Sequence, residues 1–276
     1  MYFYLYDSFL QNKKYEKILS AIEAKLTDLN INGLIGRLNI LKNSTELIRD
    51  AVKRGAKTVV VLGDDATLSN ALNSLTSSSL DGNITLGIIP VGNGSQSIAY
   101  NLGLPFGEAA CEAISRRVKA KIDIGLVNED IYFINRLECL DDFFVIEGQG
   151  GYRVTSSASR SLCYICNFKN LDLMPNQAFS LGGQQYKKFF KPQDGLMEII
   201  ISPEIKSSIF KKIFIKNQDK TSNLSILSFK NIKIFSLSPE KAVRLKLDGH
   251  RILKTPAVIS VLPQKIDMIV GRERKF

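Results

Sequence analysis

The fold of this chain is decided by the stretch Val59-Val60-Val61-Leu62-Gly63-Asp64-Asp65-Ala66-Thr67-Leu68-Ser69-Asn70. Its first four residues are β-branched or aliphatic and predict a buried strand. A small acidic turn follows, and the apolar positions after it recur at helical spacing. A strand, a tight turn and a helix N-terminus together form the usual binding site for a phosphate, because backbone N–H groups and the helix dipole point at the turn. Two carboxylates suit such a turn only if a cation bridges them to the phosphate.

The same pattern of strands and helices extends over the first 120 residues. Strands are predicted at residues 2–6, 31–40, 59–62 and 86–91. Helices are predicted at residues 15–29, between the N-cap Asn43 and the stop Gly55, from Thr67, at 96–102 and at 106–117. This alternation favours a parallel sheet with helices on both faces, in which ligands bind at the carboxyl ends of the strands. Both small-residue turns, Gly63–Thr67 and Gly92–Ser95, fall at such ends.

The pattern changes near Lys121. Short strands are expected at residues 122–127, 131–134, 143–146, 162–165, 197–201, 232–237, 242–247 and 257–262, with one helix around 207–215. This half predicts an antiparallel β-sandwich. We therefore expect an α/β domain at residues 1–120 and a β-sandwich domain at 121–276, whose last residues can return to the first domain.

Composition narrows the classes of function. The 276 residues are 45% hydrophobic and 23% charged, which is ordinary for a globular protein. No apolar run approaches the roughly 20 residues of a membrane-spanning helix. The start at Met1–Asp7 lacks the features of an export signal, so a cytoplasmic protein is expected. Four cysteines form no disulfide framework, and Cys163 and Cys166 suit burial in a strand better than a zinc or redox site.

The charge predicts an anionic partner. The chain has 37 basic and 27 acidic residues, a formal net charge of +10. Nucleotides and anionic lipid surfaces both fit such a charge. Because the chain has no Trp and no nucleic-acid-binding motif, we expect no nucleic-acid partner.

Several motifs now resemble one family. Gly63–Thr67, read G-D-D-A-T, resembles the G-G-D-G-T signature of the diacylglycerol kinase catalytic domain, shared with sphingosine and ceramide kinases and bacterial lipid kinases. Leu86–Pro105 resembles the family's L-G-I-I-P-x-G-T-G-N-D…L-G-I-P segment. Lys121–Gly125, Asp194–Ile201 and Leu247–His250, the last in place of D-G-E, match in the same order.

The resemblance implies a fold and an activity. The fold is a nucleotide-binding domain like those of NAD kinases and diacylglycerol kinases, followed by a β-sandwich. The activity is ATP-dependent phosphorylation of a lipid hydroxyl, of diacylglycerol or a related lipid, with Mg²⁺, by a protein that binds an anionic membrane peripherally. A homodimer stays open.

The resemblance also implies the site residues. Asp65, Asp248 and His250 are expected to be catalytic, and Asp65 is expected to hold Mg²⁺ through water. The residues expected to bind the nucleotide are Gly63, Asp65, Ala66, Thr67, Gly92, Asn93, Gly94 and Ser95.

The departures from the family pattern carry their own expectations. Asp64 and Ala66 stand at family glycines, where a positive φ would cost on the order of 1–2 kcal/mol. Asp64 also adds negative charge where the triphosphate should lie. His250 replaces a glutamate, and the family's N-terminal N-P-x-x-G turn is absent around Tyr6-Asp7-Ser8.

Alternatives therefore remain open at each position. Asp65 suits a helix cap, Asp248-Gly249 suits a type I′ hairpin turn, and His250 suits the surface. Two alternative functions remain open for the whole chain. It can be an inactive relative of these kinases that binds nucleotide, lipid or a protein partner, or it can be a nicotinamide-nucleotide kinase.

Overall fold

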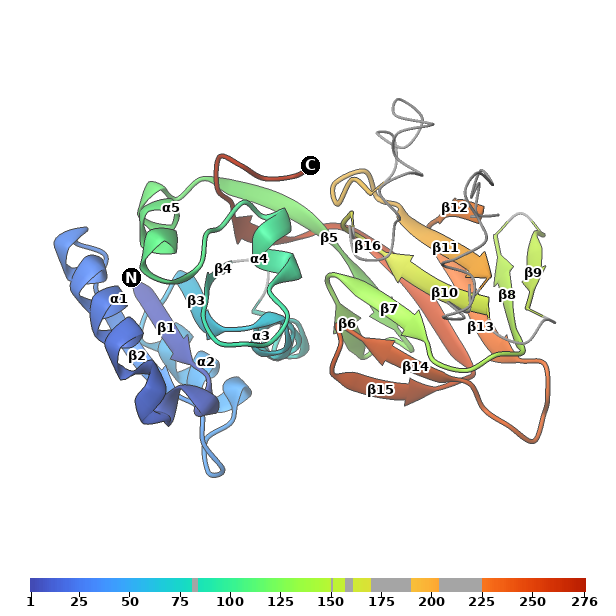
Figure 1. Ribbon diagram of the computed structural model, residues 1–276, viewed down its shortest axis with the longest axis horizontal. Coiled ribbons are helices and arrows are strands. Elements are labelled where there is room, and N and C mark those ends of the chain that lie inside the picture. The colour runs from blue at the N-terminus through green and yellow to red at the C-terminus, as the bar shows by residue number, and fades with distance from the viewer. Residues whose placement is uncertain (81–83, 150, 157–160, 170–189, 204–224) are drawn as a thin grey trace, which may run out of the picture.

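The structure is a computed structural model that describes residues 1–80, 84–149, 151–156, 161–169, 190–203 and 225–276. Its first part is a parallel sheet between two layers of helices, and its second part is built from β-strands (Figure 1). The helix expected around residues 207–215 lies outside the described residues. Among the described residues, no helix is long and apolar enough to cross a membrane.

The first part follows the predicted alternation. Its strands are β1 (Tyr2–Tyr6), β2 (Gly33–Arg37), β3 (Thr58–Gly63) and β4 (Thr85–Pro90). Its helices are α1 (Glu16–Asp28), α2 (Ser44–Lys53), α3 (Asp65–Ser77), α4 (Ser97–Asn101) and α5 (Ala110–Arg116), with the 3₁₀ turns η1 (Ser8–Gln11), η2 (Lys13–Tyr15) and η4 (Gly107–Ala109). The four strands run parallel in the order β2-β1-β3-β4. Asn43 caps α2 as predicted, since its side chain accepts a hydrogen bond from Glu46 N.

The alternation of side chains along β3 places the helices on both faces of the sheet. Val59 and Val61 pack in one core with Leu68 and Leu72 of α3. Val60 and Leu62 belong to another core, which contains residues of α1 and α5. Because successive strand residues point to opposite faces, one run of four aliphatic residues buries itself on both sides.

The second part adds antiparallel strands. They are β5 (Lys119–Val127), β6 (Ile131–Phe133), β7 (Arg136–Cys139), β8 (Phe144–Gly148), β9 (Arg153–Thr155), β10 (Ser161–Cys166), β11 (Met197–Pro203), β12 (Ser225–Phe229), β13 (Asn231–Ser236), β14 (Arg244–Leu247), β15 (Arg251–Lys254) and β16 (Ala257–Ile269). One sheet of the described chain has the order β12-β11-β10-β7-β14-β15. It packs against the strands around β13 and β16 over a shared apolar core, the arrangement of a sandwich.

The last strand, β16, is longer than predicted and joins the two parts. It was expected to end at Leu262, because the apolar alternation stops there. Instead a register shift lies between Leu262 and Ile266, and the strand continues to pair with β5 and then, in parallel, with β4. Beyond it, Gly271 N and Lys275 N donate to Leu102 O and Asn101 O of the first part. The division of the chain near residue 120 stays a prediction.

Candidate functional site

The two glycine-containing turns lie side by side at the carboxyl edge of the parallel sheet. Asp65 N donates to Ser95 O at 2.8 Å, and Val91 N donates to Gly63 O at 2.9 Å. The turns follow the adjacent strands β3 and β4, so their proximity is a consequence of parallel pairing. The sequence therefore located this edge correctly.

Asp64 begins helix α3 without backbone strain. Its φ of −117° is extended, and neither Asp64 nor Ala66 is among the residues with positive φ. The strain expected at these two positions is thus absent. Asp64 instead forms a capping box, in which its Oδ1 accepts from Thr67 N at 3.1 Å while Asp64 N donates to Thr67 Oγ1 at 3.3 Å. The side chain that replaces glycine therefore occupies an N–H group of the helix N-terminus.

Asp65 caps the next helix, α4, from across the turn. It is only 2% exposed, and its Oδ2 accepts from Ser95 Oγ at 2.5 Å and from Ser97 N and Oγ at 2.9 and 2.8 Å. Its Oδ1 accepts from Ile98 N at 3.0 Å. Burial raises the pKa of Asp65 to about 6, although these hydrogen bonds oppose the shift. Asp65 thus acts as a helix cap, and the helix that it caps is α4, which follows the neighbouring turn.

The raised pKa of Asp65 predicts a pH dependence of stability. A carboxyl whose pKa rises from 3.8 to about 6 on folding binds its proton more tightly in the folded state. Its contribution is therefore most favourable below about pH 4 and is lost as the pH rises through 6, a change of about 3 kcal/mol. An asparagine cannot titrate, so the difference in free energy of unfolding between Asp65→Asn and the wild type should shift in favour of the mutant by about this much as the pH rises from 4 to 7. Urea unfolding over this pH range measures the shift. A difference independent of pH would contradict the raised pKa.

Asp248 ties α3 to the start of the second part. This residue is 4% exposed, and its Oδ2 accepts from Ser69 Oγ of α3 at 2.8 Å and from Ile134 N at 3.0 Å. Its Oδ1 accepts from Asn135 N and Arg136 N at 2.9 and 3.0 Å. Burial raises the pKa of Asp248 against these four donors. The φ of 44° at Asp248 and 78° at Gly249 are those of the turn between β14 and β15, so the hairpin role is real as well.

His250 lies at the rim of the same region. Its Nε2 is 3.3 Å from Asn70 Oδ1 on α3, and its Nδ1 is 3.3 Å from the carbonyl oxygen of Asp248. The side chain is partly exposed. The imidazole is therefore held beside α3 yet remains open to solvent.

Asn135 connects the two buried carboxylates. Its Nδ2 donates to Ser97 Oγ at 2.6 Å, and Ser97 Oγ donates to Asp65 Oδ2. Its backbone N–H donates to Asp248. The three predicted catalytic residues thus lie around one end of α3, joined by a continuous polar network.

The turn Gly92–Ser95 carries unpaired backbone donors. The N–H groups of Gly92, Asn93 and Gly94 donate no hydrogen bond to any part of the chain that the structure describes. Successive free N–H groups of this kind form an anion-binding turn. Two side chains crowd it, however. A Cβ at Gly92 would lie 2.7 Å from the Phe9 ring, and a Cβ at Gly94 would lie 2.0 Å from Asp64 Oδ2.

The described residues contain no group of three or more His, Cys, Asp or Glu side chains placed to hold a metal ion. Asp7 and Asp64 both accept from Thr67 Oγ1, at 2.6 and 3.0 Å, and so form a pair of nearby carboxylates. A cation at this edge would therefore need ligands from a bound phosphate as well.

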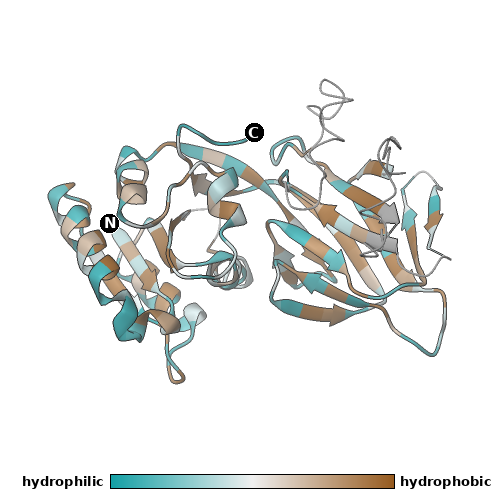
Figure 2. Ribbon diagram, viewed as in Figure 1, coloured by the Kyte–Doolittle hydropathy of each residue, from teal (hydrophilic) through white to brown (hydrophobic). Residues whose placement is uncertain are grey.

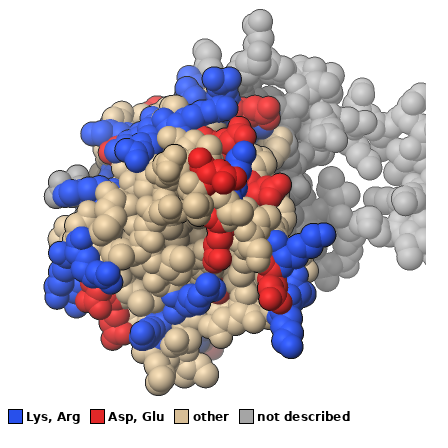
Figure 3. Space-filling model, turned by 90° about the vertical axis from the view of Figure 1, so that its left-hand side faces the viewer, with Lys and Arg blue, Asp and Glu red and all other residues tan. Residues whose placement is uncertain are grey.

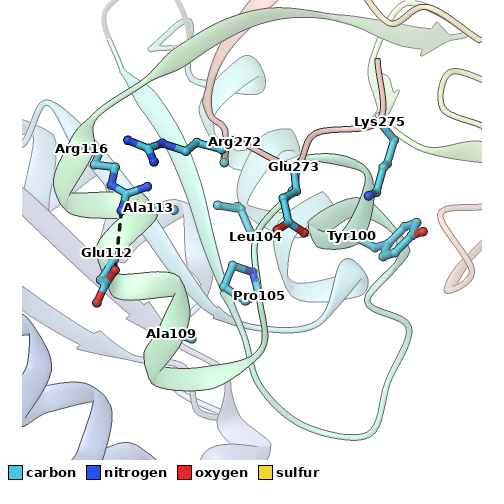
Figure 4. A pocket seen from close by; sticks show the side chains of 12 residues that line it. Tyr100, Leu104, Pro105, Ala109, Glu112, Ala113, Arg116, Arg272, Glu273 and Lys275 are labelled. Carbon is cyan, nitrogen blue, oxygen red and sulfur yellow. Dashed lines mark ion pairs between the residues drawn. The ribbon is translucent and has the colours of Figure 1, made fainter.

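One cavity of the described chain lies away from these turns. It has a volume of about 440 Å³ and lies between α4, α5 and the C-terminal residues (Figure 4). Leu104 and Pro105 contribute apolar surface, while Arg272 and Arg116 lie on one side and Lys275 and Tyr100 on the other. Arg116 is paired with Glu112 at 3.7 Å. None of the predicted site residues lines this cavity.

Asp7, Ser97 and Asn135 belong to the network but were not predicted as site residues. Asp7 directly follows β1, so its place at the carboxyl edge was a usable signal. Ser97 begins the helix after the second turn, which was a weaker signal. Asn135 has no local signal, since it reaches the site only because β6, which precedes it, packs against α3. Cys163 and Cys166 are buried thiols of β10, outside the network.

The chain is similar to known proteins of one family. Residues 3–127 match the family model of the diacylglycerol kinase catalytic domain. A crystal structure described as a diacylglycerol kinase from Bacillus anthracis str. Sterne is 18% identical, with a TM-score of 0.73 over 98% of this chain and 97% of that chain. A putative diacylglycerol kinase from the same organism is 17% identical, with a TM-score of 0.74 over the same shares.

A more distant structure shares the fold. An NAD kinase from Archaeoglobus fulgidus in complex with ATP is 13% identical, with a TM-score of 0.52 over 99% of this chain and 95% of that chain. No curated protein matches the chain significantly. The predicted fold, a nucleotide-binding α/β domain of the NAD kinase and diacylglycerol kinase type followed by antiparallel β-structure, is confirmed. Over residues 3–127 the chain is thus similar to the diacylglycerol kinase catalytic domain, and over its whole length it shares the fold of the solved diacylglycerol kinases.

Proposed function

We propose that this protein is a lipid kinase that transfers the γ-phosphate of ATP to the hydroxyl of diacylglycerol or a related lipid at an anionic membrane surface. One observation carries the proposal. The Gly63–Thr67 turn, the Gly92–Ser95 turn and the Asp248–His250 turn, which are far apart in the sequence, meet around the N-terminal half of α3. A cytoplasmic location and a division into domains at residue 120 belong to the same proposal.

The nucleotide phosphates would lie on the free N–H groups of Gly92, Asn93 and Gly94. These donors fit phosphate oxygens, and the turn is at least partly exposed. The carboxylate of Asp64 beside Gly94 opposes an unscreened phosphate, by roughly 1–4 kcal/mol for charges about 4 Å apart. When bound, ATP supplies the phosphoryl group and Mg²⁺ neutralises its charge. We therefore expect nucleotide binding to depend strongly on Mg²⁺.

Asp65 and Asp248 would have a different role from His250. Asp65 and Asp248 each accept four hydrogen bonds in the described structure, so we assign them the positioning of the two turns and of α3. His250 is the partly exposed basic nitrogen at this edge. An imidazole can accept a proton near neutral pH, so we assign it the removal of the proton from the lipid hydroxyl.

A second candidate is an inactive relative that binds nucleotide, lipid or a protein partner without phosphoryl transfer. The specific observation in its favour is the saturation of Asp65 and Asp248 by internal donors, together with the Asp64 cap on α3. Such contacts stabilise the fold whether or not chemistry takes place. A nicotinamide-nucleotide kinase has no comparable observation in its favour, and a homodimer stays a prediction.

Nucleotide binding and turnover test the proposal together. ATP should raise the thermal midpoint of the protein more with Mg²⁺ than without it, and lipid vesicles containing diacylglycerol should stimulate ATP turnover. Asp64→Asn keeps the cap but removes the charge, so it should bind Mg²⁺-free ATP about fivefold or more tightly than the wild type. Asp50→Asn, on the exposed face of α2, is the matched control.

The outcomes separate the two candidates. A Mg²⁺-dependent shift without turnover on any lipid would favour the inactive relative. No shift in either condition would exclude nucleotide binding and with it the kinase.

A further inference from the structure

The loop at residues 38–43, between β2 and α2, carries two solvent-exposed aliphatic side chains. It projects from the body of the protein (Figure 1), and its tip has the colour of hydrophobic residues (Figure 2). Ile40 and Leu41 expose 105% and 88% of their reference surface. Isolated exposed aliphatic residues are common, but two adjacent ones at the tip of a projecting loop mark an interaction site.

The loop is held in shape by its own hydrogen bonds. Asn39 Oδ1 accepts from Leu41 N at 2.8 Å and from Lys42 N at 2.9 Å. The backbones of Asn39 and Lys42 exchange hydrogen bonds of 3.3 Å, and Leu38 N donates to Tyr6 O at 2.9 Å. Since the backbone is already ordered, docking of the two side chains would cost little conformational entropy.

Basic residues accompany the apolar tip. Lys42 follows it directly, and Lys13 and Lys14 of η2 are exposed nearby in the chain segment that contacts the loop through Gln11. Figure 3 shows an uncharged centre on this side of the molecule, with Lys and Arg side chains around its margin and Asp and Glu side chains along one side of it. The exposed acids Glu16 and Glu46 lie in the same chain segments as Lys13, Lys14 and Lys42 and reduce the positive charge that these lysines provide. Aliphatic residues flanked by lysines suit an anionic lipid surface, where the apolar groups enter the acyl boundary and the amines meet the headgroups.

The loop shares an edge with the candidate site. It follows the carboxyl end of β2, which is parallel to β1 and β3. Gln11 Nε2 donates to Leu38 O at 3.0 Å, and η1 begins after Asp7, whose carboxylate accepts from Thr67 Oγ1 at 2.6 Å. A surface that receives the loop would therefore face the edge where the three turns meet.

We propose that the 38–43 loop is the membrane-insertion element of this protein, with Ile40 and Leu41 entering the acyl boundary of an anionic bilayer. The inference deepens the proposed function and rests on it for the presence of a lipid substrate. Insertion itself needs no substrate, so it can be measured separately from phosphoryl transfer.

The absence of Trp from the chain makes a direct test available. Leu41→Trp places a single indole at the tip, and its emission should shift to the blue on addition of phosphatidylcholine vesicles that contain phosphatidylserine. Brominated acyl chains should quench it. Val118→Trp, between α5 and β5 at a position 46% exposed, is the matched control and should not respond, because Arg117 beside it lies with Met1 and Thr58 at the opposite edge of the parallel sheet. Combined Ile40→Asp and Leu41→Asp should weaken vesicle co-sedimentation about 100-fold, with an unchanged thermal midpoint.

Three results would overturn the inference. The first is an indole at position 41 whose emission does not change although the protein binds vesicles. The second is co-sedimentation that the two aspartate substitutions leave unaffected. The third is an indole emission that is already shifted to the blue without vesicles, as expected if the loop were buried in a protein dimer. Insertion without ATP turnover would leave the loop assignment intact and remove only the kinase. ATP turnover without insertion would leave the kinase proposal intact and remove only the loop assignment.

Discussion

Asp248→Ala should lower the free energy of unfolding by about 3–5 kcal/mol. The carboxylate accepts from Ser69 Oγ and from the N–H groups of Ile134, Asn135 and Arg136, and nearly all of it is buried. Alanine would leave four buried donors without an acceptor. Urea unfolding at neutral pH measures the loss.

Two further variants make the result interpretable. Asp248→Asn keeps an amide oxygen for some of the donors but turns an NH₂ group toward the others, so it should lose less than alanine does. Asp50→Ala, exposed on α2, should change the free energy of unfolding by no more than about 0.5 kcal/mol. If Asp248→Ala cost as little as this control, the link between α3 and the second part would be energetically unimportant.

His250→Ala should slow lipid phosphorylation by about 10²–10⁴-fold, the usual contribution of a general base. Stability should change little, because the imidazole makes only long contacts of 3.3 Å with Asn70 and the Asp248 carbonyl. The KM for ATP should be unaffected, since the nucleotide is assigned to the Gly92–Gly94 turn. Steady-state kinetics with lipid vesicles measure both quantities.

Chemical rescue is the control for His250. It is the only histidine of the chain, so added imidazole should restore part of the lost rate through this one position. Asn70→Ala, which removes only the orienting oxygen, should have a smaller effect. Full activity of His250→Ala would refute the assignment of the base and leave the kinase proposal standing. Lost activity without imidazole rescue would argue for a structural role.

Local pattern was sufficient for most elements of the first part. The run Val59–Leu62 buries both faces because its residues alternate, and the following turn and helix can be identified from their own residues. Asp64 was interpreted from family glycines as a source of strain. Its cap on Thr67 spans only three residues and could have been predicted from sequence, since Asp is a favoured N-cap.

The network of the site needed the tertiary structure. The partners of Asp65 lie at least thirty residues away, and those of Asp248 lie more than a hundred away. No periodicity relates such positions, because their distance depends on the order of strands in the sheets and on the return of β16 to β4.

The sequence by itself thus determined the parallel sheet, the edge at which its turns meet and the resemblance of residues 3–127 to the diacylglycerol kinase catalytic domain. Only the tertiary structure decided that Asp65 caps α4 and that Asp248 joins α3 to the second part. The physical reason is that the side-chain alternation of a strand is a local property. A buried carboxylate, by contrast, must take its donors from whatever segments the fold brings beside it.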